Sequence, residues 1–363
     1  MNDYLTIQPK LESQKIRGRY VTQAHLDSFL KSFSVKTIGK SVESRPIQAI
    51  DIGAGPVNIL IWSQMHGNES TATKALLDVL CYLEQNPSLL TVFTLKVVPM
   101  LNPDGAAAYT RFNANEVDLN RDAIELSQPE SKLLIDLYQE FIPHYCFNLH
   151  DQRTLFGVNN IPCMLSFLSP AADETKKRTV AREKAMGVIG YIQNTLQEYI
   201  PNQVGRYDDT FNPNCMGDFF TQQGTPTILF EAGQAGLDYG RIETRKWYGF
   251  SILKALECIS LKLHMPTTYQ DIPEVAKSFV DVLIKNLNVD QTTTDIALQY
   301  VEVLKNEEIH FVPIVHKMGE LADLNGHRTM DLSGENMPFS KKITVGSSAI
   351  WLSELLNLTQ YSH

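Results

Sequence analysis

Short apolar segments with β-strand character alternate along the chain with amphipathic helical segments, and this alternation constrains the fold most strongly. Residues 57–64 (VNILIWSQ) and 93–99 (FTLKVVP) are typical of buried strands, and residues 70–85 between them have helical spacing of apolar residues. Further strands are expected within 37–53 and at 145–149, 163–168 and 226–230, and further helices at 23–33, 127–141, 171–199 and 241–263. The sequence therefore predicts an α/β fold, with a mixed, mostly parallel central sheet and helices on both faces.

The pattern changes after residue 265. One helix is predicted at about 273–287, followed by short strand-like runs at 298–304 and 309–315. The 363 residues exceed the roughly 250–300 at which a single hydrophobic core usually stops growing. We therefore expect a large domain at 1–265 and a small, mostly β accessory region at 266–363.

Two local predictions concern the ends of these elements. Gly53-Ala54-Gly55-Pro56 is typical of a hairpin turn, here between the strand ending at residue 53 and the strand at 57–64. Ser127-Gln128-Pro129-Glu130 has the spacing of a capping box, which places the start of a helix at Ser127.

Composition excludes several classes of protein. With 43% hydrophobic and 20% charged residues the chain can bury a sizeable core, and its net charge of −9 disfavours nucleic acid and anionic membranes as partners. The N-terminus has no signal-peptide core, and no window approaches the roughly 20 apolar residues of a membrane helix. The five cysteines are scattered without a CxxC pair, which argues against a disulfide framework or a thiolate metal site. We expect a cytoplasmic protein.

Polar clusters follow four of the predicted strands, at the edge where an open α/β sheet binds its ligands. They are His66-Gly67-Asn68-Glu69, Asn102-Pro103-Asp104-Gly105, His150-Asp151 and Glu231-Ala232-Gly233. Zinc sites that perform hydrolysis keep one position open and use three protein ligands, commonly two histidines and a carboxylate. His66, Glu69 and His150 supply that set, since one turn can aim His66 and Glu69 at the same point. The sequence therefore predicts one zinc ion held by these three side chains.

Eight segments occur in a fixed order between residue 37 and about residue 245. They are IGKSVESRPI (38–47), HGNES (66–70), NPDG (102–105), RFN (111–113), DLNR (118–121), SQPE (127–130), NLH (148–150) and FEAG (230–233). In this order and spacing the chain resembles the zinc carboxypeptidase family, the metallocarboxypeptidases or funnelins. The resemblance implies a catalytic domain at 1–265 and a zinc-dependent enzyme that hydrolyses the C-terminal peptide bond of its substrate.

The resemblance also implies roles for the residues of the motifs. Glu231 would act as general base and then as general acid, and Arg111 would polarise the scissile carbonyl and stabilise the oxyanion. Asp118 would orient a ligand histidine from outside the metal shell. Asn120 and Arg121 would hold the terminal carboxylate of the substrate, for which a guanidinium is the natural bidentate partner.

Two features of the family are less clearly matched. Tyr207 is the nearest candidate for a tyrosine that contacts the substrate from a loop before the catalytic glutamate, although it could equally pack on the surface. The residue that selects the terminal side chain should lie within 214–219, where Cys215, Met216 and Asp218 give contradictory indications. The identity of the substrate therefore stays open.

Three alternatives remain. Deacylases similar to aspartoacylase or succinylglutamate desuccinylase share several of these motifs, so the substrate is either a peptide or an acyl-amino acid with a free carboxylate. The glycines within 51–56 resemble a nucleotide-binding loop, but a strand follows them where that motif requires a helix. A non-catalytic binding module is disfavoured, because every position needed for catalysis carries a competent residue type.

Overall fold

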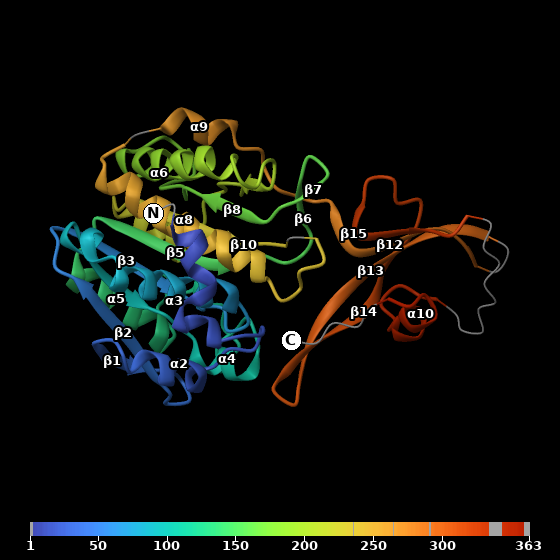
Figure 1. Cartoon of the computed structure of the whole chain (residues 1–363), viewed down its shortest axis with the longest axis horizontal. Helices are drawn as coiled ribbons and strands as arrows, with labels where there is room; N and C mark the ends of the chain where they lie inside the picture. The colour runs from blue at the N-terminus through green and yellow to red at the C-terminus, as the bar shows by residue number, and fades with distance from the viewer. Residues whose placement is uncertain (1–2, 235, 264, 290–291, 334–342, 359–363) are drawn as a thin grey trace.

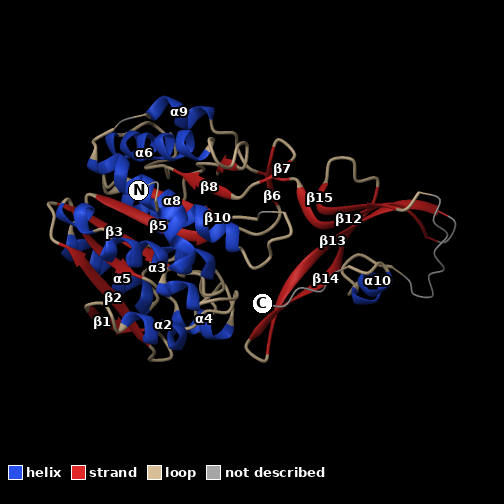
Figure 2. Ribbon diagram, viewed as in Figure 1, coloured by secondary structure: helices blue, strands red, loops and turns tan. Residues whose placement is uncertain are grey.

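The protein consists of an α/β part and a long, twisted β-sheet beside it (Figures 1 and 2). The structure is a computed structural model, and it describes residues 3–234, 236–263, 265–289, 292–333 and 343–358. In these ranges every helix is too short or too polar to span a membrane.

The α/β part is built on an eight-stranded sheet of order β1-β2-β4-β3-β5-β10-β8-β9. Its strands are β1 (Val35–Lys40), β2 (Pro46–Gly53), β3 (Val57–Ser63), β4 (Phe93–Val98), β5 (Tyr145–Asp151), β8 (Leu165–Leu168), β9 (Val204–Arg206) and β10 (Thr227–Ala232). Four neighbouring pairs are parallel (β4/β3, β3/β5, β5/β10 and β8/β9), and the other three are antiparallel. The predicted mixed, mostly parallel sheet is confirmed.

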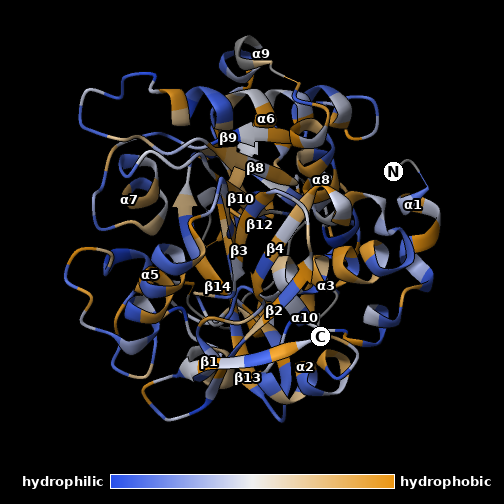
Figure 3. Ribbon diagram, turned by 90° about the vertical axis from the view of Figure 1, so that its left-hand side faces the viewer, coloured by the Kyte–Doolittle hydropathy of each residue, from blue (hydrophilic) through white to orange (hydrophobic). Residues whose placement is uncertain are grey.

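Helices cover both faces of this sheet, as Figure 3 shows with the strands between them. One face carries α3 (Ser70–Gln85), α6 (Val180–Leu196) and α8 (Ile242–Ser260), and the other carries α5 (Pro129–Phe141) and α7 (Met216–Gln222). Strand β3 shows why both faces are apolar: Ile59 and Ile61 pack in the α3/α6/α8 core, whereas Leu60 and Trp62 pack in the α5/α7 core. Successive side chains of a strand point to opposite faces, so a strand covered on both sides is apolar throughout.

The remaining elements are short, or belong to two other sheets. The helices are α1 (Tyr4–Ile7), α2 (Gln23–Leu30), α4 (Pro103–Ala108), α9 (Pro266–Asp271) and α10 (Ile350–Leu355), with 3₁₀ turns at Gln8–Lys10, Glu12–Lys15, Pro87–Thr91 and Leu119–Arg121. A three-stranded sheet of order β11-β6-β7 joins β11 (Ala276–Lys277) to β6 (Phe156–Val158) and β7 (Ile161–Pro162).

The C-terminal sheet has the order β14-β13-β12-β15. Its strands are β12 (Phe279–Val289), β13 (Thr292–Lys305), β14 (Glu308–Gly319) and β15 (Asn325–Asp331). This confirms the expected C-terminal β structure, but the helix predicted at 273–287 is wrong, since Ala276–Lys277 form β11 and β12 begins at Phe279. Residues 279–284 are all buried, and a strand of this sheet pairs with β12 on each side. The division at residue 265 stays a prediction.

The predicted hairpin at 53–56 is also wrong. Strands β2 and β3 are not neighbours, because β4 lies between them and pairs with both. The segment instead packs against the start of β4 and the turn before it: the amides of Ala54 and Gly55 donate to the carbonyls of Leu90 and Phe93. The turn residues between β2 and β3 suggested that these two strands pair directly. The pairing of β4 with both of them excludes it.

The capping box predicted at Ser127 does not form. Helix α5 begins at Pro129 with Gln128 at its N-cap, and Ser127 bonds to the carboxylate of Asp122 instead. Glu130 accepts hydrogen bonds from the backbone of Val42 and the side chain of Asn113. The helix predicted over 171–199 is likewise shorter, because α6 starts only at Val180.

Lys74 is a buried cation on α3 whose ammonium donates to the carbonyl of Gly18. Burial, together with the positive charges of Arg245 and Arg19, lowers the pKa of Lys74 from 10.5 to about 7. A lysine of this kind destabilises the fold whenever it is protonated.

We expect the free energy of unfolding of the wild type to rise relative to Lys74→Met between pH 7 and pH 9. Unfolded Lys74 keeps its usual pKa near 10.5, so in this window the unfolded state binds a proton that the folded state lacks. The difference grows by up to about 1.4 kcal/mol per pH unit. Urea denaturation at pH 7, 8 and 9 measures it, and a constant difference would show that Lys74 does not lose its proton in the folded protein.

Candidate metal centre

The predicted ligands come from the carboxyl ends of two adjacent parallel strands. His66 and Glu69 lie in the turn between β3 and α3, and His150 lies within β5. Asp151, the next residue, accepts hydrogen bonds from the amides of Thr71 and Ala72 at 2.8 and 2.9 Å. These bonds satisfy two free donors at the start of α3 and hold that helix end against β5. The fold thereby fixes the position of Glu69 relative to His150.

Gly67 allows the turn to lie against the start of α4. A Cβ atom built on Gly67 would lie 1.9 Å from the carbonyl carbon of Gly105, which no side chain can tolerate. The amide of Asn68 donates to the carbonyl of Thr110, which holds the two segments together. The glycines of the HGNE and NPDG motifs thus serve one close backbone contact.

We expect Gly67→Ala to lower the free energy of unfolding by at least about 2 kcal/mol, because the added methyl group forces two backbone segments apart. Urea denaturation of the variant measures the loss. A stability within about 0.5 kcal/mol of the wild type, the range of neutral surface changes, would show that the turn can move without penalty.

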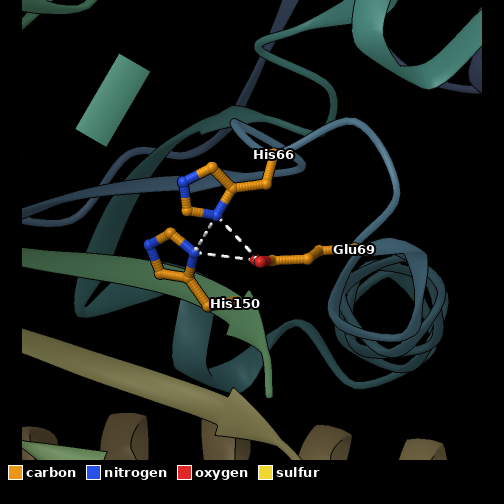
Figure 4. A group of neighbouring side chains, drawn as sticks. All are labelled: His66, Glu69 and His150. Atoms are coloured by element: carbon orange, nitrogen blue, oxygen red, sulfur yellow. Dashed lines mark hydrogen bonds and ion pairs between the residues drawn. The ribbon is translucent and has the colours of Figure 1, made fainter. Parts of the chain in front are cut away.

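The three side chains converge on one point (Figure 4). Their candidate ligand atoms all lie within 4.8 Å of one another, and all three residues are buried. The Nδ1 atoms of His66 and His150 are 3.1 Å apart, and each lies 2.8 Å from an oxygen of Glu69. Two imidazole nitrogens and a carboxylate are the donor set that zinc prefers, so the arrangement fits this ion.

Asp118 and Arg111 border this cluster. Asp118 Oδ1 lies 3.0 Å from Nε2 of His66, and its Oδ2 accepts a 3.0 Å hydrogen bond from Nε of Arg111. When Nε2 of neutral His66 donates to Asp118, the lone pair is left on Nδ1, the atom that faces Glu69 and His150. A nitrogen of the Arg111 guanidinium also lies 3.4 Å from Glu69, and the Arg111 side chain is 40% exposed.

Residues 23–176, which contain the whole cluster, match the family model described as zinc carboxypeptidase. Over these residues the chain is similar to zinc carboxypeptidases. This similarity, together with the donor set of the His-Glu-His cluster, favours zinc as the metal. The match ends well before Glu231, so the roles of the later residues depend on geometry and on the proposal below.

Proteins named as carboxypeptidases match the chain over short segments. A probable carboxypeptidase 2 of Trichophyton verrucosum is 32% identical over 97 residues, which are 25% of this chain and 19% of that protein. Carboxypeptidase SOL1 of Arabidopsis thaliana is 29% identical over 159 residues, 35% of this chain and 32% of that protein. The matched part of the chain thus spans about a fifth to a third of these relatives.

Solved structures show the same fold at low sequence identity. A metallo-carboxypeptidase from Burkholderia cenocepacia superposes with a TM-score of 0.54 at 17% identity, covering 67% of this chain and 70% of that chain. Carboxypeptidase A from Helicoverpa armigera superposes with a TM-score of 0.51 at 17% identity, covering 71% and 82%.

The charge states of the cluster are set by its own members. Burial opposes ionisation of Glu69, but His66 and His150 outweigh it and hold the pKa of Glu69 well below its usual range. Burial also opposes protonation of His66, yet Glu69 and Asp118 raise its pKa overall. For His150 burial prevails and lowers the pKa. A carboxylate that stays ionised beside two imidazoles favours binding of a divalent cation.

Glu231 lies next to His150 across the sheet. The two are register partners on the parallel strands β10 and β5, so their side chains point to the same face. Burial, followed by the charges of Glu69 and Asp151, raises the pKa of Glu231 well above its usual value. Its Oε2 is buried and has no hydrogen-bond partner among the described residues. Glu231 therefore presents a carboxyl oxygen that no other protein group in this part of the chain engages.

The residues predicted to bind substrate line one cavity with this cluster. The cavity has a volume of about 540 Å³, and its lining includes the metal cluster, Arg111, Glu231, Asn120, Arg121 and Tyr207. The Asn120 side chain accepts from the amide of Met216, and the exposed Arg121 donates to the sulfur of Cys215 at 3.0 Å. The Tyr207 hydroxyl donates to Gln152 at 3.0 Å, and burial and Glu231 raise its pKa.

The same cavity contains residues that the sequence analysis did not select or could not rank. Within 214–219, Cys215, Gly217 and Asp218 line it. Burial raises the pKa of Asp218 to about 6. Gln152 and Arg153, which directly follow His150-Asp151, were missed, although a polar pair at the end of the ligand-bearing strand was a usable signal.

Proposed function

We propose that the chain is a zinc-dependent carboxypeptidase that hydrolyses the amide bond next to a terminal residue with a free carboxylate. His66, Glu69 and His150 would hold one zinc ion. The observation that supports this most strongly is the convergence of these side chains in a cavity that also contains Glu231 and the cations Arg111 and Arg121. That combination provides a metal site, a base and two anion-binding groups within a single cavity.

Zinc bound at this cluster supplies a Lewis acid, which lowers the pKa of water to about 7 and polarises a carbonyl. Glu231, whose Oε2 has no protein partner in the described chain, takes the proton of the attacking water and passes it to the leaving nitrogen. Arg111 has an exposed guanidinium beside Glu69 and stabilises the negative charge that develops on the carbonyl oxygen.

The C-terminal carboxylate binds at Arg121 and Asn120, which line the same cavity. Arg121 offers a solvent-exposed guanidinium, and its contact with the backbone of Asn120 at 2.6 Å fixes its direction. The Asn120 side chain is held by the amide of Met216, so its NH₂ group is the part that can donate to substrate. The Tyr207 hydroxyl donates to Gln152 in this structure. Tyr207 also lines the cavity, from which it contacts the substrate.

A substrate panel tests this proposal. Zinc-loaded protein is incubated with peptides that have free or amidated C-termini, and with N-acyl amino acids. We expect release of the last residue from free peptides and not from amidated ones, because the amide removes the charge that Arg121 recognises. Cleavage of N-acyl amino acids without any cleavage of peptides would favour the deacylase alternative. A zinc-loaded protein that cleaves nothing would favour a binding module.

A further inference from the structure

A second cavity lies between the metal cluster and the C-terminal sheet. Its volume is about 280 Å³, at the lower end of the range for ligand pockets. It shares five lining residues with the larger cavity, namely Glu69, Arg111, Asp151, Gln152 and Arg153. A substrate whose scissile carbonyl lies at Glu69 and Arg111 can therefore extend into both.

The C-terminal sheet forms one wall of this second cavity. Tyr300, Val301 and Glu302 of β13 and Asp281 of β12 line it. Arg19 joins Glu302 in an ion pair at 3.1 Å, and Asp281 accepts a 2.9 Å hydrogen bond from the Tyr239 hydroxyl. These contacts link the sheet to the α/β part, so the wall is held at a fixed distance from the metal cluster.

The carboxylates of this lining already have protein partners. Glu302 is bonded by Arg19 and the Tyr109 hydroxyl, and Asp281 by Tyr239, Gln299 and the amide of Tyr300. Asp151 bonds the start of α3 and lies 3.5 Å from Arg241, and Glu69 belongs to the metal cluster. The acidic groups are therefore not available to bind a cationic ligand.

Arg153 differs from the other cations of the lining. Arg19 pairs with Glu302, Arg241 with Asp151, and Arg111 with Asp118 and Glu69. Arg153 is exposed and has no hydrogen bond or ion pair with any residue in the described ranges. It stands where the two cavities meet, three residues after His150, and its guanidinium is free to receive an anion from the substrate.

We propose that the second cavity binds the acyl side of the substrate and that Arg153 binds a carboxylate on that side. This inference rests on the proposed function. Arg121 lines only the larger cavity, so a substrate whose terminal carboxylate lies there directs the acyl portion past Arg111 toward Arg153. The small volume and the wall of β13 favour a short acyl portion. The carboxylate comes either from an acidic residue before the terminal residue or from a dicarboxylic acyl group.

Matched substrates that differ by one charge test the proposal. The terminal residue is the one cleaved best in the panel described above. The peptide pair is N-acetyl-Glu and N-acetyl-Gln joined to that residue, and the acyl pair is its N-succinyl and N-butanoyl derivatives. We expect kcat/KM to favour the charged member by roughly tenfold in at least one pair, as for a charge-assisted hydrogen bond. The pair that shows the preference identifies the source of the carboxylate.

Variants assign the preference to Arg153. Arg153→Gln should reduce the ratio of charged to neutral kcat/KM to about one, and Arg153→Lys should restore part of it. Arg178→Gln removes an exposed arginine outside both cavities, and should keep the wild-type ratio.

Two outcomes would overturn the inference and can be told apart. If the wild type cleaves both members of each pair equally, or if Arg153→Gln keeps the preference, the inference fails while the proposed function stands. If the wild type cleaves none of these substrates and none of the panel, the proposed function fails, and the inference fails with it.

Discussion

Replacing Glu231 by glutamine should reduce kcat at least about 1000-fold and leave the zinc content at one ion per chain. The amide keeps the shape of the side chain but cannot accept the proton of the attacking water, and general-base catalysis contributes typically 10²–10⁴-fold. Glu231 is not a member of the candidate metal cluster, so binding of the ion does not depend on its charge. Steady-state kinetics on the best peptide of the panel and metal analysis of the purified variant measure the two quantities.

Glu198→Gln is the matched control, because Glu198 is an exposed carboxylate outside both cavities. It should keep the wild-type kcat and zinc content. If Glu231→Gln retained more than about a tenth of the wild-type kcat, a loss far below the usual contribution of a general base, another group would have to take the proton. If it lost the zinc instead, Glu231 would belong to the metal site.

His66→Ala should lose both the metal and the activity. The imidazole places Nδ1 against Glu69 and His150, and its Nε2 contacts Asp118. Removing even an outer-shell partner typically lowers metal affinity 10–100-fold, so loss of a ligand should lower zinc affinity more than about 100-fold. Competition with a chromogenic zinc chelator measures the affinity, and thermal unfolding with and without zinc gives an independent reading, because a ligand that binds only the folded state stabilises it.

His310→Ala controls for loss of a histidine, since His310 lies on β14, outside the metal cluster. This variant should bind zinc as the wild type does, and zinc should raise its melting temperature equally. An unchanged zinc affinity in His66→Ala would contradict the assignment of the metal ligands. Removal of zinc from the wild type with a chelator should abolish activity, and added zinc should restore it.

The sequence predicted the fold class because buried strands leave a local signature. β3 is apolar on both faces, as a strand covered by helices on both sides must be. Pairing between distant segments has no such signature. The turn residues at 53–56 suggested a hairpin, whereas β4 inserts between β2 and β3. The segment at 273–287 resembled a helix because its apolar residues have mixed spacing, but pairing with β13 and β15 makes it a strand.

The candidate site was predictable to the extent that its residues lie in short motifs at strand ends. His66 and Glu69 follow β3, and His150 lies near the carboxyl end of β5. Because β3 and β5 are parallel neighbours, their carboxyl ends bring the three side chains together. The wall of the second cavity could not be predicted. It needs Arg19 and Glu302, which are 283 residues apart, to meet through packing of the C-terminal sheet against the α/β part. The proposed role of Arg153 depends on that wall, because the wall forms the second cavity that Arg153 lines.

The most direct test of the metal assignment is an anomalous difference map, recorded above the zinc absorption edge from crystals of the zinc-loaded protein. A single strong peak between Nδ1 of His66, Nδ1 of His150 and the carboxylate of Glu69, with Glu231 on the open side, is the expected result. A zinc peak on other residues would contradict the assignment. The absence of a peak at these three residues, in crystals that contain one zinc ion per chain, would contradict it as well.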